Sequence, residues 1–335
     1  MQPVQAPPRV SRGAAAWYIA AFLAVQVLML LSTFVLPGTQ WFLWHDHYPA
    51  LRNFGYSQRA GRLDCQVLIY GDSSSLTGMD PAIIQAKTGL KTCNVSEGVT
   101  IQAVVGSDVP LEAYLKRNPP PRVLLGTWTP SGFRPDIAPF NAYMPEGAVY
   151  AMQFGERRQL LRFLVHHPKL MAKYSIWVLQ SLAGGAVDEV TGKARRQIDA
   201  RAERDARMGQ WPYPVPPETH CVRTEYHITP DQIGRYEPSV AAFRRKYTTP
   251  QTVVIADVSP VPTCDVSYNL YAERAAGLYD NTFDRLPITD FNEGDVHFSA
   301  SGSRYISEQA AAQILAVIQK QGASPSRTPE ASAAP

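Results

Sequence analysis

The longest apolar run of the chain lies close to the N-terminus. Residues 14–36 carry no charge, and about 20 consecutive apolar residues are enough to cross the hydrocarbon core of a bilayer as a helix. Tryptophan and tyrosine flank the run, as at membrane interfaces, and Arg9 and Arg12 precede it. The pattern predicts a single transmembrane helix, and the positive-inside rule places residues 1–13 in the cytoplasm and the rest of the chain outside.

A cleaved signal peptide is the alternative interpretation of this run. Its apolar core would span only about 7–15 residues and would end at a small-x-small cleavage site. Neither Ser32–Phe34 nor Leu36–Gly38 matches such a site well. We therefore expect an uncleaved, single-pass anchor in the inner (cytoplasmic) membrane and a periplasmic or otherwise extracytoplasmic C-terminal domain.

Beyond the anchor, the pattern changes to alternating strands and helices. Residues 37–63 have no clear period and are expected to form a juxtamembrane linker. Residues 64–321 contain short apolar runs that alternate with helical patterns, which predicts an α/β domain with a parallel central sheet. The expected strands are Val67–Tyr70, Thr92–Ser96, Arg122–Gly126 and Thr252–Val258, and the expected helices are Pro81–Lys87, Leu111–Arg117 and Ser299–Lys320.

One long segment interrupts this alternation. Residues 130–250 contain few strand signals, and we interpret them as an insertion beside the sheet: a lid, a partner surface or a plain surface elaboration. Within it, Val187–Met208 is dense in charges of both signs and is expected to form a solvated helix. Residues 322–335 are of low complexity and are expected to be disordered.

Composition narrows the functional classes. The 335 residues include 32 Lys and Arg against 29 Asp and Glu, a net charge of +3. This balance is too even for the concentrated basic face that nucleic-acid binding requires, so no nucleic-acid partner is expected.

The four cysteines agree with an oxidising compartment. Cys65, Cys93, Cys221 and Cys264 form no CxxC motif and have no histidine at metal-ligand spacing, so no metal site is expected. If the strands beside Cys65 and Cys93 are parallel neighbours, both sulfurs lie at the same end of the sheet. We therefore expect the pairs Cys65–Cys93 and Cys221–Cys264; four buried free thiols are the alternative.

The candidate chemistry lies at the carboxyl edge of the predicted sheet. Ser73 follows the first strand directly, and open α/β sheets bind ligands at this edge. His297 and Asp295 precede the last helix, whose leading loop we expect at the same edge. A serine hydroxyl needs such partners, because a neutral hydroxyl is a poor nucleophile. Catalysis is the favoured interpretation.

Structural roles for the same residues are the alternative. Asp72 would then cap the turn, Ser74 and Ser75 would be the exposed hydroxyls, and His297 would be hydrogen-bonded to solvent.

Two blocks carry a resemblance to a known family. GDSSSLTG (71–78) and DVHFSASG (295–302) resemble the first and last blocks of the SGNH/GDSL hydrolase superfamily. With its anchor, the chain is similar to bacterial proteins of alginate O-acetylation and of D-alanine transfer to teichoic acids. The resemblance implies a three-layer α/β fold, with Ser73 as nucleophile, His297 as base and Asp295 as its orienting acid. It also implies that the Gly98 N–H joins that of Ser73 in the oxyanion hole.

The implied function is a serine-dependent acyl esterase or O-acyltransferase that acts on a surface or exported polysaccharide. The resemblance suggests no cofactor or metal, and its partners would be the acylated glycan and a membrane-embedded acyltransferase.

The sequence departs from the family pattern at two places. The last block is usually DxxH, but residue 294 is glycine and the acid is Asp295. The superfamily also has a third block, usually Gly-x-Asn-Asp, which would fall at residues 126–129. Its asparagine, an oxyanion-hole donor, is replaced by Trp128, so Thr127 or Asn94 would have to take its place. Loss of one oxyanion donor typically costs about 10²–10³ in rate. A rival hypothesis is therefore a non-catalytic scaffold, or a glycan-binding subunit of a membrane polysaccharide-modification complex.

Overall fold

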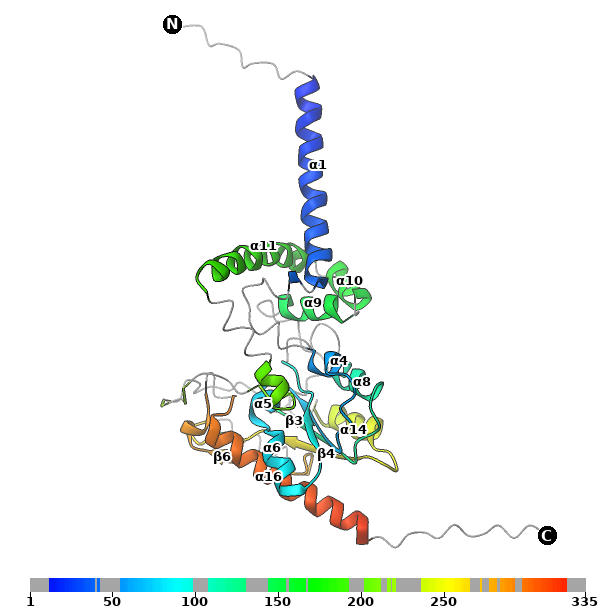
Figure 1. Ribbon diagram of the computed structural model, residues 1–335, viewed down its shortest axis with the longest axis vertical. Coiled ribbons are helices and arrows are strands. Elements are labelled where there is room, and N and C mark those ends of the chain that lie inside the picture. The colour runs from blue at the N-terminus through cyan, green and yellow to red at the C-terminus, as the bar shows by residue number, and fades with distance from the viewer. Residues whose placement is uncertain are drawn as a thin grey trace, which may run out of the picture.

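The structure of the protein is a computed structural model in which an isolated helix leads into an α/β body (Figure 1). The described residues are 12–39, 41–42, 55–98, 108–130, 144–154, 157–166, 168–192, 202–211, 216–217, 219–220, 236–265, 272, 277–281, 284–292 and 297–323.

Helix α1 (Arg12–Val35) projects away from the rest of the molecule (Figure 1). Within the apolar segment Gly13–Gly38, the most apolar window of 18 residues has a mean hydropathy of 2.4, and 6% of that window is buried. A short 3₁₀ turn, η1 (Leu36–Gly38), follows, with Pro37 near its start. Among the described helices, α1 is the one long and apolar enough to span a membrane, as the sequence predicted.

The core of the body is a four-stranded parallel sheet. Its strands are β1 (Val67–Gly71), β2 (Thr92–Asn94), β3 (Val123–Trp128) and β4 (Val253–Val258). Their order across the sheet is β2-β1-β3-β4, and every neighbouring pair is parallel. The four predicted strands and the parallel α/β class are therefore confirmed.

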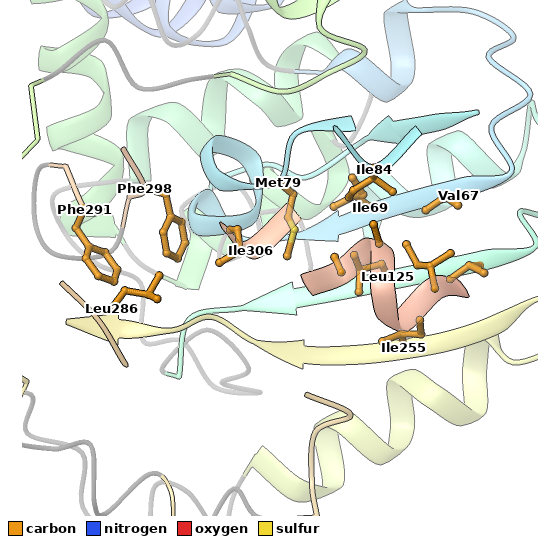
Figure 2. Close-up of a cluster of buried hydrophobic side chains, with 14 residues drawn as sticks. Val67, Ile69, Met79, Ile84, Leu125, Ile255, Leu286, Phe291, Phe298 and Ile306 are labelled. Carbon is orange, nitrogen blue, oxygen red and sulfur yellow. The ribbon is translucent and has the colours of Figure 1, made fainter. Parts of the chain in front are cut away.

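Helices cover both faces of this sheet. Side chains alternate between the two faces along each strand, so each face carries its own buried apolar residues. Val67, Ile69 and Leu125 pack on one face with helices α6 (Pro81–Thr88) and α16 (Ala300–Ala323), as Figure 2 shows. On the other face, Leu68, Tyr70 and Leu124 pack against α8 (Val109–Leu115) and α14 (Tyr236–Tyr247). The remaining short described elements are α4 (Tyr56–Arg59), α5 (Ser73–Gly78), β5 (Val261–Pro262), β6 (Arg285–Leu286) and η2 (Ile288–Asp290).

Local sequence signals correctly predicted the position of α6. The Asp80 carboxylate caps the helix by accepting a hydrogen bond from the Ala82 N–H, and Pro81 occupies the first turn. Gly89 ends the helix with a φ of 69°, in the left-handed region that favours glycine.

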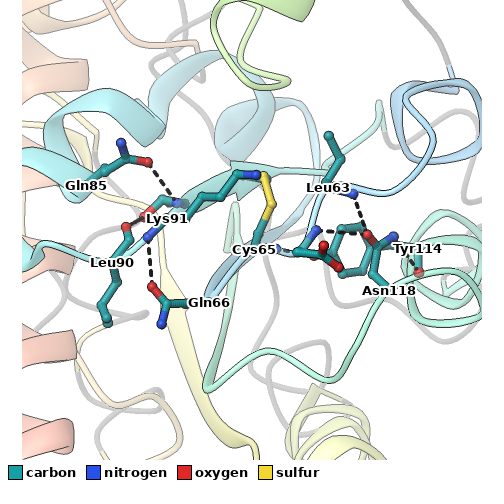
Figure 3. Close-up of a disulfide and its surroundings, with 11 residues drawn as sticks. Leu63, Cys65, Gln66, Gln85, Leu90, Lys91, Tyr114 and Asn118 are labelled. Carbon is teal, nitrogen blue, oxygen red and sulfur yellow. Dashed lines mark hydrogen bonds between the residues drawn. A yellow bond between two sulfur atoms is a disulfide. The ribbon is translucent and has the colours of Figure 1, made fainter.

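A disulfide joins Cys65 to Cys93, as predicted (Figure 3). Cys65 lies just before β1 and Cys93 within β2, and their Cα atoms are 5.9 Å apart. The bond closes a loop with a sequence separation of 28 residues that contains Ser73, which by chain entropy is worth about 3–4 kcal/mol. Cys264 is also disulfide-bonded; Cys221, its expected partner, lies outside the described residues.

A second core joins part of the predicted insertion to the foot of α1. It is formed by α9 (Met144–Gln153), α10 (Arg157–His166) and α11 (Pro168–Val190). Phe42, from the expected linker, is fully buried in this core. The described part of the expected linker (37–39, 41–42 and 55–60) therefore contains buried residues and is not a featureless connection.

The expectation of a solvated helix over Val187–Met208 holds only in part among the described residues. Helix α11 ends at Val190, residues 202–206 are again helical and mostly exposed, and Arg204 is fully buried beside the sheet. Residues 193–201 lie outside the described residues. A dense mixture of charges predicts an exposed helix only when no charge finds a buried partner, and Arg204 has one, as described below.

Candidate functional site

The candidate nucleophile stands on a tightly held turn at the carboxyl end of β1. Strand β1 ends at Gly71, and Ser73 opens the short helix α5 (Ser73–Gly78). A Cβ atom at Gly71 would lie 1.8 Å from the carbonyl oxygen of Thr127, so only glycine allows β1 and β3 to approach this closely. The sequence predicted the turn but not α5 itself.

The Asp72 carboxylate holds this turn in place. One oxygen accepts hydrogen bonds from the Ser74 N–H (3.0 Å) and the Ser74 hydroxyl (2.7 Å). The other accepts from the Thr129 N–H (2.9 Å) and hydroxyl (2.8 Å), at the end of β3. Asp72 is 2% exposed. The alternative role of Asp72 as a structural cap is therefore confirmed.

The three consecutive serines have different environments. The Ser74 hydroxyl lies 2.7 Å from that of Ser259, and the Ser75 hydroxyl accepts a 3.0 Å hydrogen bond from Ser96; both serines are fully buried. The suggestion that they are the exposed hydroxyls is therefore wrong, because both bind the neighbouring strand ends. Ser73 alone of the three is partly exposed, and its hydroxyl makes no hydrogen bond within the described residues.

Gly98 reaches the same turn. The chain after β2 continues along β1, with Val95 N–H donating to Ile69 O (2.9 Å) and Glu97 N–H donating to Gly71 O (3.4 Å). Gly98 is the next residue and is half-buried. In the described part of the chain, no hydrogen bond uses the backbone N–H of Ser73 or of Gly98, so both amides remain available to a ligand.

Asn94 and Thr127, the two side chains expected to supply an oxyanion donor in place of Trp128, have different surroundings. Both hydrogens of the Asn94 amide are committed, to Ser75 O (2.8 Å) and Met79 O (3.1 Å), so Asn94 fastens α5 to β2. Thr127 is buried in the wall of a cavity that Ser73 does not line. The Asn94 assignment is therefore wrong, because both of its amide hydrogens are already used. That of Thr127 stays a prediction.

Trp128, where the resemblance to the SGNH superfamily would place an asparagine, is a core residue. Its ring packs edge-on against Phe243 (centroids 5.0 Å apart) and Tyr70 (6.1 Å). A Cβ atom at Gly126 would lie 2.2 Å from the indole, so the glycine makes room for it. The described turn thus offers backbone amides as hydrogen-bond donors, while Trp128 is held in the core.

His297 lies in the loop that leads into α16 and is half-buried. Its carbonyl accepts a 2.6 Å hydrogen bond from the Asn292 N–H, and Phe298 forms a bridge with Phe291 that closes the loop. Asp295, the expected orienting acid, lies outside the described residues.

The loop with His297 is held against α5. The Phe298 ring would be 2.4 Å from a Cβ atom at Gly78, at the end of α5, and the Ser303 hydroxyl donates to Gly78 O (2.6 Å). The structure thus brings the two sequence blocks together without forming a hydrogen bond between Ser73 and His297. Catalytic hydrogen bonds are often loose before a substrate binds.

A buried ion pair that no local sequence pattern indicated supports the turn of Ser73 from the side of β2. The Arg204 guanidinium lies 3.3 Å from the Glu97 carboxylate, and both side chains are 0% exposed. Arg204 also donates to Ser96 O (2.9 Å) and Gly209 O (2.9 Å), while Glu97 accepts from the Gly55 N–H (2.9 Å).

Residues after Arg204 continue this support. The Trp211 N–H donates to Leu76 O (3.1 Å), and the Gln210 amide donates to Thr77 O (3.2 Å). The described part of the insertion thus satisfies the carbonyl groups at the end of α5. The charge pattern gave no signal for this, because Arg204 sits among many exposed charges.

A cavity of about 390 Å³ lies between β3, β4 and α16. Asp257 of β4 lines it and accepts a 3.2 Å hydrogen bond from the Gln313 amide. Burial raises the pKa of the Asp257 carboxyl to about 7, although the Gln313 hydrogen bond opposes this increase. Among the described residues, the Thr127 hydroxyl and the Gln313 carbonyl oxygen in the cavity wall have no hydrogen-bond partner. Within the described residues, no group of three His, Cys, Asp or Glu side chains could hold a metal ion.

We predict that Asp257→Asn removes a pH-dependent loss of stability. The unfolded chain releases the Asp257 proton near pH 3.8 and the folded chain near pH 7, so stability falls as the pH rises through this window. The variant keeps the shape without the charge. Its thermal unfolding curve should match that of the wild type near pH 4 and should show a free energy of unfolding higher by on the order of 2–4 kcal/mol near pH 8. Equal pH dependence of the two proteins would contradict the prediction.

Comparison with known proteins adds no relative: no protein-family model, curated protein or solved structure matches the chain.

Proposed function

We propose that the chain is a membrane-anchored SGNH-like serine esterase or O-acyltransferase that acts on an acylated surface or exported polysaccharide. The observation that carries the proposal is the environment of Ser73. It presents a partly exposed hydroxyl on a rigid turn at the carboxyl edge of the sheet, while the two serines beside it are buried and hydrogen-bonded. Ligands of open α/β sheets bind at this edge.

The proposed mechanism is acyl transfer through Ser73. The Ser73 oxygen attacks the acyl carbonyl carbon, and His297 accepts the hydroxyl proton. The backbone N–H groups of Ser73 and Gly98 stabilise the oxyanion, and collapse of the tetrahedral intermediate expels the alcohol, which takes the proton from His297. A sugar hydroxyl or water then attacks the acyl-enzyme by the same steps in reverse. Asp295 would hold the imidazole in the required tautomer.

The proposal includes the location of the reaction. Helix α1 would span the inner membrane, with residues 1–13 in the cytoplasm and the α/β domain in the periplasm. The domain would adopt the three-layer SGNH arrangement, which the helices on both faces of the sheet support. Because acetyl-CoA is cytoplasmic, a membrane-embedded acyltransferase would supply the acyl group; this partner follows from the family resemblance alone.

Covalent labelling of the full chain tests the nucleophile. A fluorophosphonate probe reacts when a serine oxygen attacks phosphorus and fluoride leaves, so it identifies activated serines. We expect mass spectrometry to find the phosphonyl group on Ser73, and labelling to disappear in Ser73→Ala. Ser301→Ala, which removes an exposed serine of α16, should retain full labelling. An unlabelled wild-type protein would overturn the assignment of Ser73.

A second candidate is the non-catalytic, glycan-binding scaffold. The observation that favours it is the loss of side-chain oxyanion donors, since Trp128 is packed in the core and the Asn94 amide is committed to α5. Failure of the fluorophosphonate to react, combined with binding of acylated glycan to the same protein, would support this function instead.

A further inference from the structure

Helix α11 has a buried stripe and, on the opposite side, an apolar stripe that is exposed. The buried stripe consists of Tyr174, Val178, Ser181, Gly185 and Asp188. A second stripe, at spacings of three and four residues on the opposite side, is exposed to solvent; it consists of Ile176 (54% exposed), Leu179 (42%), Ala183, Val187 (60%) and Val190 (90%). A solvated helix normally carries polar residues on its outer face. The exposed stripe therefore requires a non-aqueous neighbour or a specific partner.

This stripe lies where α1 leaves the body. Helix α11 contacts α1, α9 and α10, and Phe34 and Leu36 at the end of the apolar segment pack on the same core as Tyr174. In Figure 1, α11 lies crosswise at the foot of α1, with α9 beneath it and α1 rising above. The buried stripe faces the core, so the exposed stripe points to the side from which α1 rises.

Basic side chains accompany the apolar ones. Arg158, Leu161, Arg162 and Val165 are exposed on α10, and Lys169 and Lys173 are exposed on α11. Neither helix contains an acidic residue before Asp188. A helix that exposes Leu and Val beside Arg and Lys is typical of segments that lie in the interface of a membrane containing anionic lipids.

We infer that α10 and α11 form an interfacial platform that lies in the outer headgroup layer of the bilayer spanned by α1. The exposed stripe of α11 enters the boundary between headgroups and acyl chains, and the basic residues contact lipid phosphates. The inference rests on the proposed insertion of α1 and is independent of the chemistry of Ser73. The platform fixes the height and orientation of the α/β body above the membrane, and therefore the distance from the bilayer to the carboxyl edge of the sheet.

Spin labels on the full chain test this inference. The protein is reconstituted in vesicles of phosphatidylglycerol and phosphatidylcholine, with a nitroxide attached through Val187→Cys or Val190→Cys. Ala316→Cys on α16 is an exposed control far from α1, and Val25→Cys reports the insertion of α1. We expect the ratio of oxygen accessibility to nickel-chelate accessibility to be several-fold higher at the α11 positions than at Ala316, and highest at Val25.

Each outcome separates the alternatives. A buried label at Val25 with aqueous labels at both α11 positions would overturn the platform and leave the anchor intact. An aqueous label at Val25 would overturn both. If the α11 labels are shielded from the nickel chelate only at a high ratio of protein to lipid, a second copy of the chain covers the stripe. That result would overturn the lipid assignment.

Discussion

Ser73→Ala is expected to lower kcat/KM for p-nitrophenyl acetate by about 10³-fold or more, since removal of the nucleophile of a serine triad costs up to about 10⁶ in rate. Part of the residual rate would come from the oxyanion amides. The structure predicts that this loss is not caused by unfolding: Ser73 is partly exposed, and its hydroxyl makes no hydrogen bond in the described part of the chain. Initial rates of p-nitrophenol release by the full chain in detergent, with thermal unfolding of both proteins, measure the effect.

The companion variants show whether the residues act as a unit. His297→Ala alone and Ser73→Ala/His297→Ala together should reduce kcat/KM by nearly the same factor as Ser73→Ala, because members of one catalytic unit are strongly non-additive. Multiplicative losses would mean that His297 acts elsewhere. Turnover by Ser73→Ala equal to that of the wild type would remove Ser73 from the mechanism and favour the scaffold.

The sheet was predictable because its signals are local. Each strand is a short apolar run bounded by turn residues, and α6 has its cap and its terminating glycine in adjacent positions. The pairing of Cys65 with Cys93 followed from one further step, that β1 and β2 are parallel neighbours. The position of Ser73 at the carboxyl edge follows from the same reasoning.

The environment of the site depends on contacts between distant residues, which local patterns do not encode. Arg204 meets Glu97 across 107 residues, and no feature of its charged neighbourhood distinguishes it from an exposed arginine. The packing of Trp128 was accessible in principle: it shares a face of β3 with Leu124 and Gly126, and that face is buried. Because alternate residues of a strand share a face, the sequence would have predicted a tryptophan in the core at position 128, and not a replacement for a catalytic residue.

The largest stability effect is expected for the buried ion pair beside the site. Arg204→Met should lower the free energy of unfolding by about 3–5 kcal/mol, because the Glu97 carboxylate would remain buried without its cation. The guanidinium also donates to Ser96 O and Gly209 O, so its removal releases the segment that covers the end of α5. Urea denaturation followed by circular dichroism measures the change.

Arg207→Met is the matched control, three residues further along the same segment. Arg207 pairs with Glu203 at 3.1 Å, but these side chains are 45% and 49% exposed, compared with 0% for Arg204 and Glu97. Exposed pairs are worth about 0–1 kcal/mol, so this variant should unfold almost as the wild type does. Glu97→Gln combined with Arg204→Met should recover part of the loss, because neither of the two charges of the pair then remains buried. Equal, small effects of Arg204→Met and Arg207→Met would show that the insertion does not brace the turn that carries Ser73.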